Sequence, residues 1–278
     1  MKAKKLLIAF LILALMVVVS PAAFAASTLQ VYFLDVGQGD STLIRTPKGQ
    51  QVLIDGGEKS QGGNVLKYLK QYGVKELDAV IATHPDSDHV GGLAAVLNAI
   101  PAKSVYAPKV SHTTQTYKDF LLAVQNRGLK IKTVTAGVKL PLDGVQAEFL
   151  APVGDYGKDL NAWSAVLKLT YQNTSYLFSG DAERKSETDM LKNNRAKLKA
   201  DVYKVGHHGS DTSTSDDFLQ AIKPAYAVIS VGKNNKFGHP KDVVMKRLEN
   251  AKVKVYRTDK QGTIISTSDG KKITFKAA

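Results

Sequence analysis

The sequence of 278 residues contains no cysteine, so the fold uses neither disulfides nor thiolate metal ligands. Any metal site must then be built from histidine and carboxylate, which favours zinc, manganese or another borderline-to-hard divalent ion. After residue 26 the chain also lacks low-complexity segments and linkers rich in proline, glycine or serine, and one domain is the simplest organisation. A hydrophobic fraction of 44% and a charged fraction of 23% exclude a disordered or collagen-like chain.

The one long apolar run of the sequence lies at the N-terminus. It spans residues 6–19 behind a basic start, and Ala23-Phe24-Ala25 offers small residues at a spacing that signal peptidase accepts. We therefore expect residues 1–25 to be a cleaved secretory signal peptide and residues 26–278 to be the secreted protein. An uncleaved anchor is the alternative, although the run is shorter than the about 20 residues of a membrane span. Because no cysteine follows the run, a lipoprotein anchor is excluded.

Positive charge dominates the sequence. The formal net charge is +13, and removal of Lys2, Lys4 and Lys5 with the signal peptide would lower it to +10. A secreted basic protein is expected to associate with anionic partners such as DNA, anionic cell-wall polymers or lipid head groups. Charge alone does not choose among these partners, and a purely solubilising role is the alternative.

The hydrophobic pattern predicts an α+β protein. Short segments separated by glycine-rich turns predict a meander of strands at 29–34, 41–46 and 51–54. Strands then alternate with amphipathic segments that predict helices, the first near 65–72 and the last at 240–250. This order favours an αββα sandwich, with two central sheets and helices outside, rather than one parallel βαβ ladder.

Histidines and carboxylates gather in the loops that follow predicted strands. The segment His84-Pro85-Asp86-Ser87-Asp88-His89 places four potential ligands within six residues, directly after the predicted buried strand 77–83. A tight loop at this point can direct His84 and Asp86 at one ion and Asp88 and His89 at another. A solvated acidic loop with incidental histidines is the alternative, but unpaired charge beside an apolar strand end is costly. Gly91-Gly92 follows and lets the next helix pack closely.

This segment is similar to the His-x-His-x-Asp-His motif of the metallo-β-lactamase superfamily, with Asp86 at the position of the second histidine. With that departure the chain resembles the soluble hydrolase domain of the ComEC family of DNA-uptake proteins and their secreted stand-alone relatives. Six further segments match in order and extend the resemblance over nearly the whole chain after residue 26: Leu34–Ser41, Leu53–Gly57, Asn161–Ser164, Phe178–Asp181, Lys204–Ser210 and Gly238–Pro240. The resemblance implies the metallo-β-lactamase fold. Because no channel-forming membrane domain accompanies these segments, we do not expect DNA import.

The resemblance also implies a set of metal ligands. In the superfamily one ion takes the first two ligands of the motif and a later histidine, and the second ion takes the aspartate, the last histidine of the motif and a histidine near the C-terminus. His84 and Asp86 would then hold the first ion, and Asp88 and His89 the second. Asp181 would bridge both ions, although a helix N-cap is an alternative role for it.

The late histidines are less well defined. His207 is the first choice for the late ligand, with His208 as a proton donor or phosphate contact, because adjacent turn residues do not easily reach one ion. His239 is expected to be a ligand or a general acid. A loop histidine without a chemical role is the alternative for His239 and for one of the adjacent pair. No histidine stands near 161–164, where the superfamily has its later first-ion ligand, so one or two divalent ions, zinc or manganese, are expected.

Other polar residues of the matching segments are expected to orient ligands or contact substrate: Asp35, Gln38, Asp40, Asn161, Ser164, Lys204 and Ser210. For the loop between Asp35 and Asp40, turn formation alone is the alternative. The sequence contains no signal for the oligomeric state.

The expected activity is hydrolysis by metal-activated water, with a phosphodiester, DNA above all, as substrate. Asp88 or Asp86 would accept the proton of the water, and His208, His207 or His239 would protonate the leaving oxygen. A hydrolase of small esters, lactones or cell-wall phosphodiesters is one alternative. A non-catalytic module that binds DNA or the wall around a structural metal is another. A serine hydrolase is disfavoured because no serine has a Gly-x-Ser-x-Gly setting.

Overall fold

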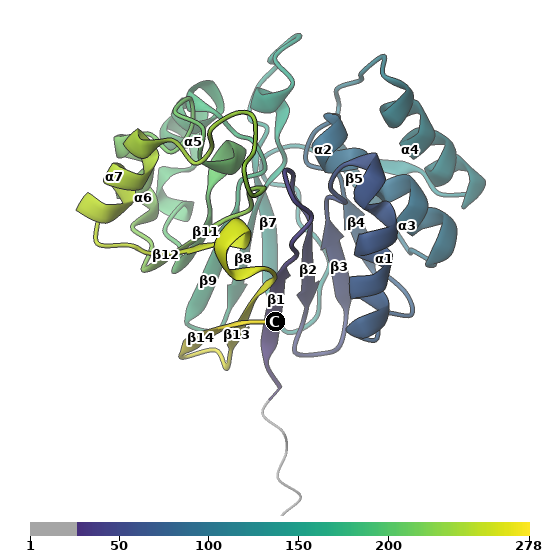
Figure 1. Cartoon of the computed structure of the whole chain (residues 1–278), viewed down its shortest axis with the longest axis horizontal. Coiled ribbons are helices and arrows are strands. Elements are labelled where there is room, and N and C mark those ends of the chain that lie inside the picture. Colours follow the sequence, from purple (N-terminus) through teal and green to yellow (C-terminus); the bar gives the residue numbers. More distant parts are fainter. Residues whose placement is uncertain (1–26) are drawn as a thin grey trace, which may run out of the picture.

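Two β-sheets pack face to face in the computed structural model, which describes residues 27–278 (Figure 1). The expected signal peptide, residues 1–25, lies outside the described residues, so its cleavage and the secretion of the protein stay predictions. Within the described range, none of the helices has the length and apolar character required to cross a membrane.

The first sheet has eight strands in the order β14-β13-β1-β2-β3-β4-β5-β6. Neighbours pair antiparallel from β14 to β3 and parallel from β3 to β6. The strands are β1 (Leu29–Phe33), β2 (Thr42–Arg45), β3 (Gln51–Ile54), β4 (Ala79–Ile81), β5 (Val105–Pro108), β6 (Ile131–Val134), β13 (Ile264–Ser268) and β14 (Ile273–Ala277).

The second sheet has six strands in the order β12-β11-β10-β9-β8-β7. Here β7, β8 and β9 pair antiparallel, and β9 to β12 pair parallel. The strands are β7 (Gln146–Ala151), β8 (Val166–Tyr171), β9 (Thr174–Phe178), β10 (Val202–Lys204), β11 (Tyr226–Ile229) and β12 (Lys254–Arg257).

Helices cover the outer face of each sheet (Figure 1). The first sheet is covered by α1 (Gly62–Gln71), α3 (Leu93–Ala99) and α4 (Gln115–Asn126), with the short α2 (Ser87–Val90) beside them. The second is covered by α5 (Arg184–Asn194), α6 (Asp216–Ile222) and α7 (Asp242–Asn250), and α8 (Thr258–Gln261) follows β12. Thr114 caps α4 by accepting a hydrogen bond from the backbone N–H of Tyr117 (3.3 Å).

The core has three layers because the strands alternate their buried side chains between two faces. In β1, Val31 and Phe33 join the layer between the sheets, where they meet Phe178 of β9. Tyr32 faces the other way, into the layer that also holds Leu69 of α1. A third layer lies between the second sheet and its helices. The predicted αββα sandwich is therefore confirmed.

Parallel strands form part of each sheet. The expectation of two sheets rather than one parallel βαβ ladder is confirmed, and each sheet contains a run of four parallel strands, β3 to β6 and β9 to β12. The helices between them supply the crossovers that parallel neighbours need. The meander predicted at the start of the chain is confirmed by the antiparallel strands β1, β2 and β3.

These parallel runs determine where the polar loops meet. The carboxyl ends of parallel strands lie at one edge of a sheet, and open α/β sheets bind their ligands there. The segment from His84 follows β4, Asp181 follows β9, and the His207-His208 pair follows β10. The segments that carry the predicted metal ligands therefore lie at the same edge of the sandwich.

Close backbone contact holds this edge together at Gly92. A Cβ atom there would lie 2.1 Å from the carbonyl oxygen of Gly56, well inside van der Waals contact. Gly63, in the first turn of α1, has open space at the same position. The expected reason for the double glycine, close packing of the following helix, is thereby confirmed.

We predict that Gly92→Ala lowers the free energy of unfolding by about 1–3 kcal/mol, because the backbone must shift to admit the methyl group. Gly63→Ala is the control and should raise it by about 0.5–1 kcal/mol, since alanine favours helix. Urea unfolding followed by circular dichroism, with EDTA present so that metal binding does not contribute, measures both. A Gly92→Ala protein as stable as the parent would contradict the packing argument.

Candidate metal centre

Carboxylates and imidazoles converge at this edge from three loops. Asp88 and His89 lie on α2 behind β4, Asp181 follows β9, and His208 lies in the 3₁₀ turn Gly206–Gly209 behind β10. Each of these four residues offers one ligand atom, and the four atoms lie within 4.8 Å of one another. Three of the side chains are buried and that of Asp88 is partly exposed. The group has the size and composition of a site for one divalent cation.

The Asp181 carboxylate is the centre of a larger cluster. Its Oδ2 atom lies near the Nε2 atoms of four histidines, at 3.2 Å from His89, 3.5 Å from His208, 3.7 Å from His207 and 4.0 Å from His84. The N-cap position of α5 is occupied by Glu183, so capping that helix is not the role of Asp181. A carboxylate with four imidazole nitrogens around it has the chemistry required of a ligand shared between two ions.

The same four imidazoles are held from behind through their other ring nitrogen. The Nδ1 contacts are Thr83 Oγ1 for His84 (3.1 Å), Asp55 Oδ2 for His89 (2.9 Å), Glu183 Oε1 for His207 (2.8 Å) and the Ser230 carbonyl oxygen for His208 (2.9 Å). Partners at Nδ1 fix the ring orientation and leave Nε2 free, as in metal-ligating histidines. All four rings therefore present Nε2 to the Asp181 carboxylate.

Unpartnered atoms at the centre fit a metal ion. Within residues 27–278, the buried atoms His84 Nε2, His89 Nε2 and Asp181 Oδ1 have no hydrogen bond of acceptable geometry. A buried polar atom left unsatisfied costs about 1–3 kcal/mol. A cation bound among these lone pairs would satisfy them, so the donor set of the site matches the metal ions that the sequence predicted.

The charges of the cluster shift its titrations strongly. Burial alone would raise the pKa of Asp181, but His89 and His208 outweigh it and hold that pKa well below the usual range. Burial alone would lower the pKa of His208, but Asp181, Asp40 and Asp88 outweigh it and raise the pKa to about 10. The pKa of His89 is likewise raised, by Asp181 first among its neighbours. In the metal-free protein, the raised pKa values of His89 and His208 therefore favour protons at positions where cations would bind.

An unusual backbone directs both adjacent histidines inward. His207 (φ 46°, ψ 48°) and His208 (φ 54°, ψ 20°) both adopt the left-handed backbone conformation, which residues other than glycine rarely adopt. Their rings lie 6.0 Å apart at 69°. Both Nε2 atoms approach Asp181 Oδ2, at 3.7 Å from His207 and 3.5 Å from His208. That one of the pair is a ligand and the other a proton donor or phosphate contact stays a prediction.

His84, Asp86 and His207 lie outside the compact group of four residues but next to it. The Nε2 atom of His84 is 3.5 Å from Asp86 Oδ2, and the side chain of Asp86 is 34% exposed. Ser164 supports this part of the site: its Oγ accepts a hydrogen bond from the Asp181 backbone N–H (3.0 Å) and lies 3.5 Å from His84 Nδ1. These residues offer a second set of donors around the Asp181 carboxylate.

A buried ion pair supports His208. Lys204 Nζ lies 2.6 Å from Asp40 Oδ2, and both side chains are almost fully buried. The other carboxylate oxygen of Asp40 is 3.4 Å from His208 Nδ1. The positive charge of Lys204 allows the buried Asp40 carboxylate to remain ionised next to His208.

The remaining supporting residues named from the sequence do not contact the cluster. Asp35 Oδ1 accepts the Gly37 N–H in a local turn, and Gln38 Oε1 accepts an N–H from the loop after β11. Ser210 Oγ pairs with a neighbouring threonine within its own loop. Asn161 hydrogen-bonds the Glu183 carboxyl and thereby helps, after His207, to lower its pKa. Their contacts stabilise the loops that carry the cluster.

His239 lies at the rim of the cluster. Its ring centroid is 5.6 Å from that of His207 and 6.5 Å from that of His208. Burial, followed by the charges of these two histidines, lowers the pKa of His239 to about 4. The imidazole is therefore neutral at pH 7 and suited to hydrogen bonding, whereas a general acid at that pH needs the proton that this ring has lost.

Sequence reasoning missed three supporting residues, Asp55, Thr83 and Glu183. Asp55 is fully buried and accepts hydrogen bonds from the backbone N–H and the hydroxyl of Thr83 (2.8 and 2.7 Å) while it contacts His89. Its position directly after a strand, in Asp55-Gly56-Gly57, was the available signal. Glu183 carried no signal, because only the fold brings it to His207.

Comparisons with known proteins agree with this architecture. The model of the metallo-beta-lactamase superfamily matches residues 34–233. The ComE operon protein 3 of Bacillus subtilis is 36% identical over 252 residues, which are 84% of this chain and 32% of that protein. The competence protein ComA of Neisseria gonorrhoeae is 32% identical over 256 residues, 92% of this chain and 35% of that protein.

A solved structure shows the same fold at low identity. The metallo-beta-lactamase fold protein YhfI from Bacillus subtilis superposes with a TM-score of 0.58 at 12% identity, over 87% of this chain and 100% of that one. This chain spans about a third of the length of the curated relatives it matches. The resemblance inferred from the motifs is confirmed. The protein is a member of the metallo-β-lactamase superfamily and is related to competence proteins.

Proposed function

We propose that the protein is a metal-dependent phosphodiesterase that cleaves DNA. The observation that carries the proposal is the Asp181 Oδ2 atom, which lies within 4.0 Å of four imidazole Nε2 atoms. A carboxylate shared by two cations is the arrangement with which many phosphatases and nucleases hold the attacking and leaving oxygens.

Two ligand sets share that carboxylate in the proposal. Asp88, His89 and His208 hold one ion with Asp181, which is the compact group of four. His84, Asp86 and His207 hold the other with Asp181. His207 thus takes the place of the later first-ion histidine that the sequence pattern lacks. Zinc and manganese both suit these nitrogen and oxygen donors.

The residues of the chain have separate roles around the ions. When bound, divalent ions supply Lewis acidity, which lowers the pKa of a water and offsets charge on a phosphoryl oxygen. Asp86 and Asp88 have the partly exposed carboxylates of the cluster, 34% and 24%, and are the groups that an incoming water meets as proton acceptors. His239, neutral at pH 7, donates a hydrogen bond to the substrate phosphate.

Charge and relatives support DNA as the substrate. The net charge of +10 expected after removal of residues 1–25 favours a polyanion. The relatives include proteins named for competence and, in Haemophilus influenzae, recombination protein 2, which is 34% identical over 85% of this chain. With the expected signal peptide removed, the enzyme would act outside the cell, where anionic wall polymers are a second binding partner.

We predict that Asp181→Asn lowers metal-dependent cleavage of single-stranded DNA by at least about a hundred-fold, because both ions lose a charged ligand. Asp143→Asn is the matched control: this exposed residue contacts Gln50 near the start of β3, at the opposite edge of the sandwich. Cleavage is followed on gels with added zinc or manganese. Metal-loaded wild-type protein that cleaves no DNA would reject the nuclease function, and an unimpaired Asp181→Asn protein would reject the bridging role.

Metal binding is predicted to release protons. The pKa of His208 is raised to about 10, and that of His89 is raised well above its usual value, so the metal-free site favours protonated imidazoles. Ions must displace these protons, and affinity should rise as the pH is raised from 6 to 9. Isothermal calorimetry at pH 7 in Hepes and in Tris should show binding enthalpies that differ in proportion to the protons released. Equal enthalpies in the two buffers would contradict this protonation state.

A further inference from the structure

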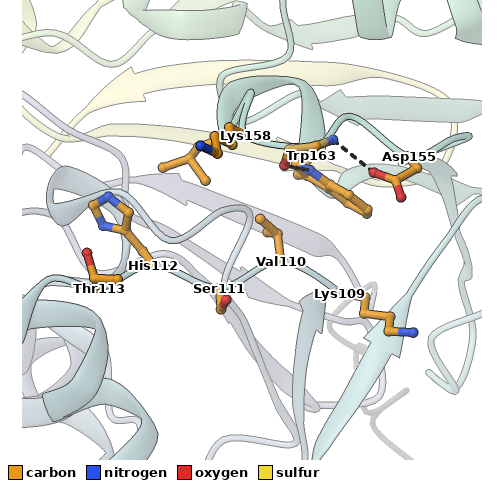
Figure 2. Close-up of a pocket in the computed structure, with 10 residues that line it drawn as sticks. Lys109, Val110, Ser111, His112, Thr113, Asp155, Lys158 and Trp163 are labelled. Atoms are coloured by element: carbon orange, nitrogen blue, oxygen red, sulfur yellow. Dashed lines mark hydrogen bonds between the residues drawn. The ribbon is translucent and has the colours of Figure 1, made fainter.

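A groove of about 730 Å³ lies beside the metal centre, between two loops of different sheets. One wall is the segment 109–113 after β5, and the other is the segment 155–163 before β8. Figure 2 shows Val110 on the first segment and Trp163 on the second facing each other. The volume is that of a small-ligand site.

Trp163 is held rigidly in this groove. Its indole N–H donates a hydrogen bond to the Gly157 carbonyl (3.1 Å), and its ring meets the ring of Tyr156 edge-to-face, with centroids 5.7 Å apart. Tyr156 is anchored in turn by a hydrogen bond from its hydroxyl to Asp189 (3.0 Å). Because the indole N–H already donates a hydrogen bond, Trp163 presents an oriented aromatic surface to the groove rather than a hydrogen-bond donor.

Two lysines give the groove positive charge. Lys109 and Lys158 are exposed, one in each wall, and neither forms an ion pair within residues 27–278. The one carboxylate of the lining, Asp155, is partly occupied, since its Oδ1 accepts the Gly157 N–H (2.8 Å). Free ammonium groups beside a fixed aromatic ring suit a ligand that is both flat and anionic.

Both walls of the groove adjoin the site at His84. Val110 lines the groove and also a small cavity next to His84 and Pro85. Trp163 directly precedes Ser164, whose Oγ contacts Asp181 and His84. A ligand in the groove therefore lies against two segments that also adjoin the position of the proposed reaction.

We propose that this groove binds a nucleotide of single-stranded nucleic acid next to the cleaved phosphodiester. The base stacks on Trp163, and the phosphates beside it contact Lys109 and Lys158. In a duplex both faces of an internal base are covered by neighbouring base pairs, so only an unpaired base is free to stack on a protein side chain. The inference rests on the proposed phosphodiesterase function and names its preferred substrate as an unpaired strand.

Trp163 is the single tryptophan of the chain, so its fluorescence reports stacking directly. The metal-loaded full chain is titrated with a 12-nucleotide phosphorothioate strand, which resists cleavage, and with the same strand annealed to its complement. We expect the single strand to quench Trp163 and to bind more tightly than the duplex. Equal quenching by the duplex, or quenching by an acidic peptide in place of the oligonucleotide, overturns the proposal.

Variants separate the contribution of stacking to strand binding from that of charge. Binding is measured by the fluorescence anisotropy of a labelled single strand. Trp163→Ala should weaken binding by roughly 5- to 150-fold, and Trp163→Phe, which keeps an aromatic face, by less. The double variant K109Q/K158Q should reduce the slope of log affinity against log salt by about 1.4. K67Q/K70Q, with the same charge change on exposed lysines of α1, should leave that slope closer to wild type.

Hydrolysis of a small phosphodiester without a base distinguishes failure of this inference from failure of the proposed function. We expect the wild-type protein to hydrolyse that compound and Trp163→Ala to lose affinity for the strand. Wild-type hydrolysis with unchanged strand affinity in Trp163→Ala retains the phosphodiesterase and rejects the groove. Absence of hydrolysis in the wild-type protein rejects the proposed function, and Trp163 quenching then shows whether the groove still binds the strand.

Discussion

Burial of the Asp181 carboxylate is the constraint on which the site depends. A buried negative charge requires compensation, and here four imidazoles from two separate segments surround one oxygen atom. The raised pKa values of His89 and His208 favour protons that supply positive charge in the metal-free protein, and in the proposed function divalent ions would replace them. The two sheets meet at this point, because Asp181 belongs to the second sheet and His89 to the first. The electrostatics of the cluster therefore link both halves of the sandwich.

The loops maintain this arrangement through strained backbone and a second set of contacts. Asp55, His207 and His208 all adopt positive φ, which costs free energy and persists where surrounding structure fixes it. Asp55 is fixed by its hydrogen bonds to Thr83, and His207 and His208 by their Nδ1 contacts. Three of the eight non-glycine residues with positive φ in residues 27–278 thus lie in the loops of the cluster, and backbone strain of this kind is often found at functional sites.

Much of this architecture was predictable from sequence patterns. Short, mainly apolar segments between glycine-rich turns placed strands such as β1 and β3 to within a residue, because both faces of these strands are buried. The segment from His84 to His89 was recognisable because its ligands are adjacent in sequence. Asp181 was identified through the resemblance, since a lone aspartate after a strand carries no local signal of its own.

Other features depend on tertiary structure and had no local signal. The sequence His207-His208 contains no signal that both residues adopt the left-handed backbone conformation. The approach of both rings to Asp181 was therefore not predicted. Glu183 reaches His207 only through the loop that follows β9. The parallel runs within each sheet depend on pairing between distant strands, which periodicity does not report. The groove at Trp163 likewise requires two loops that are far apart in sequence.

The shared carboxylate is tested most directly by counting ions and measuring their coupling. The full chain is reconstituted with manganese, its metal content is determined, and the sample is examined by electron paramagnetic resonance. Two ions that share Asp181 would lie about 3.5–4 Å apart. The account predicts two manganese ions per chain with an exchange-coupled spectrum. One ion per chain, or two with the spectrum of isolated manganese, would contradict it.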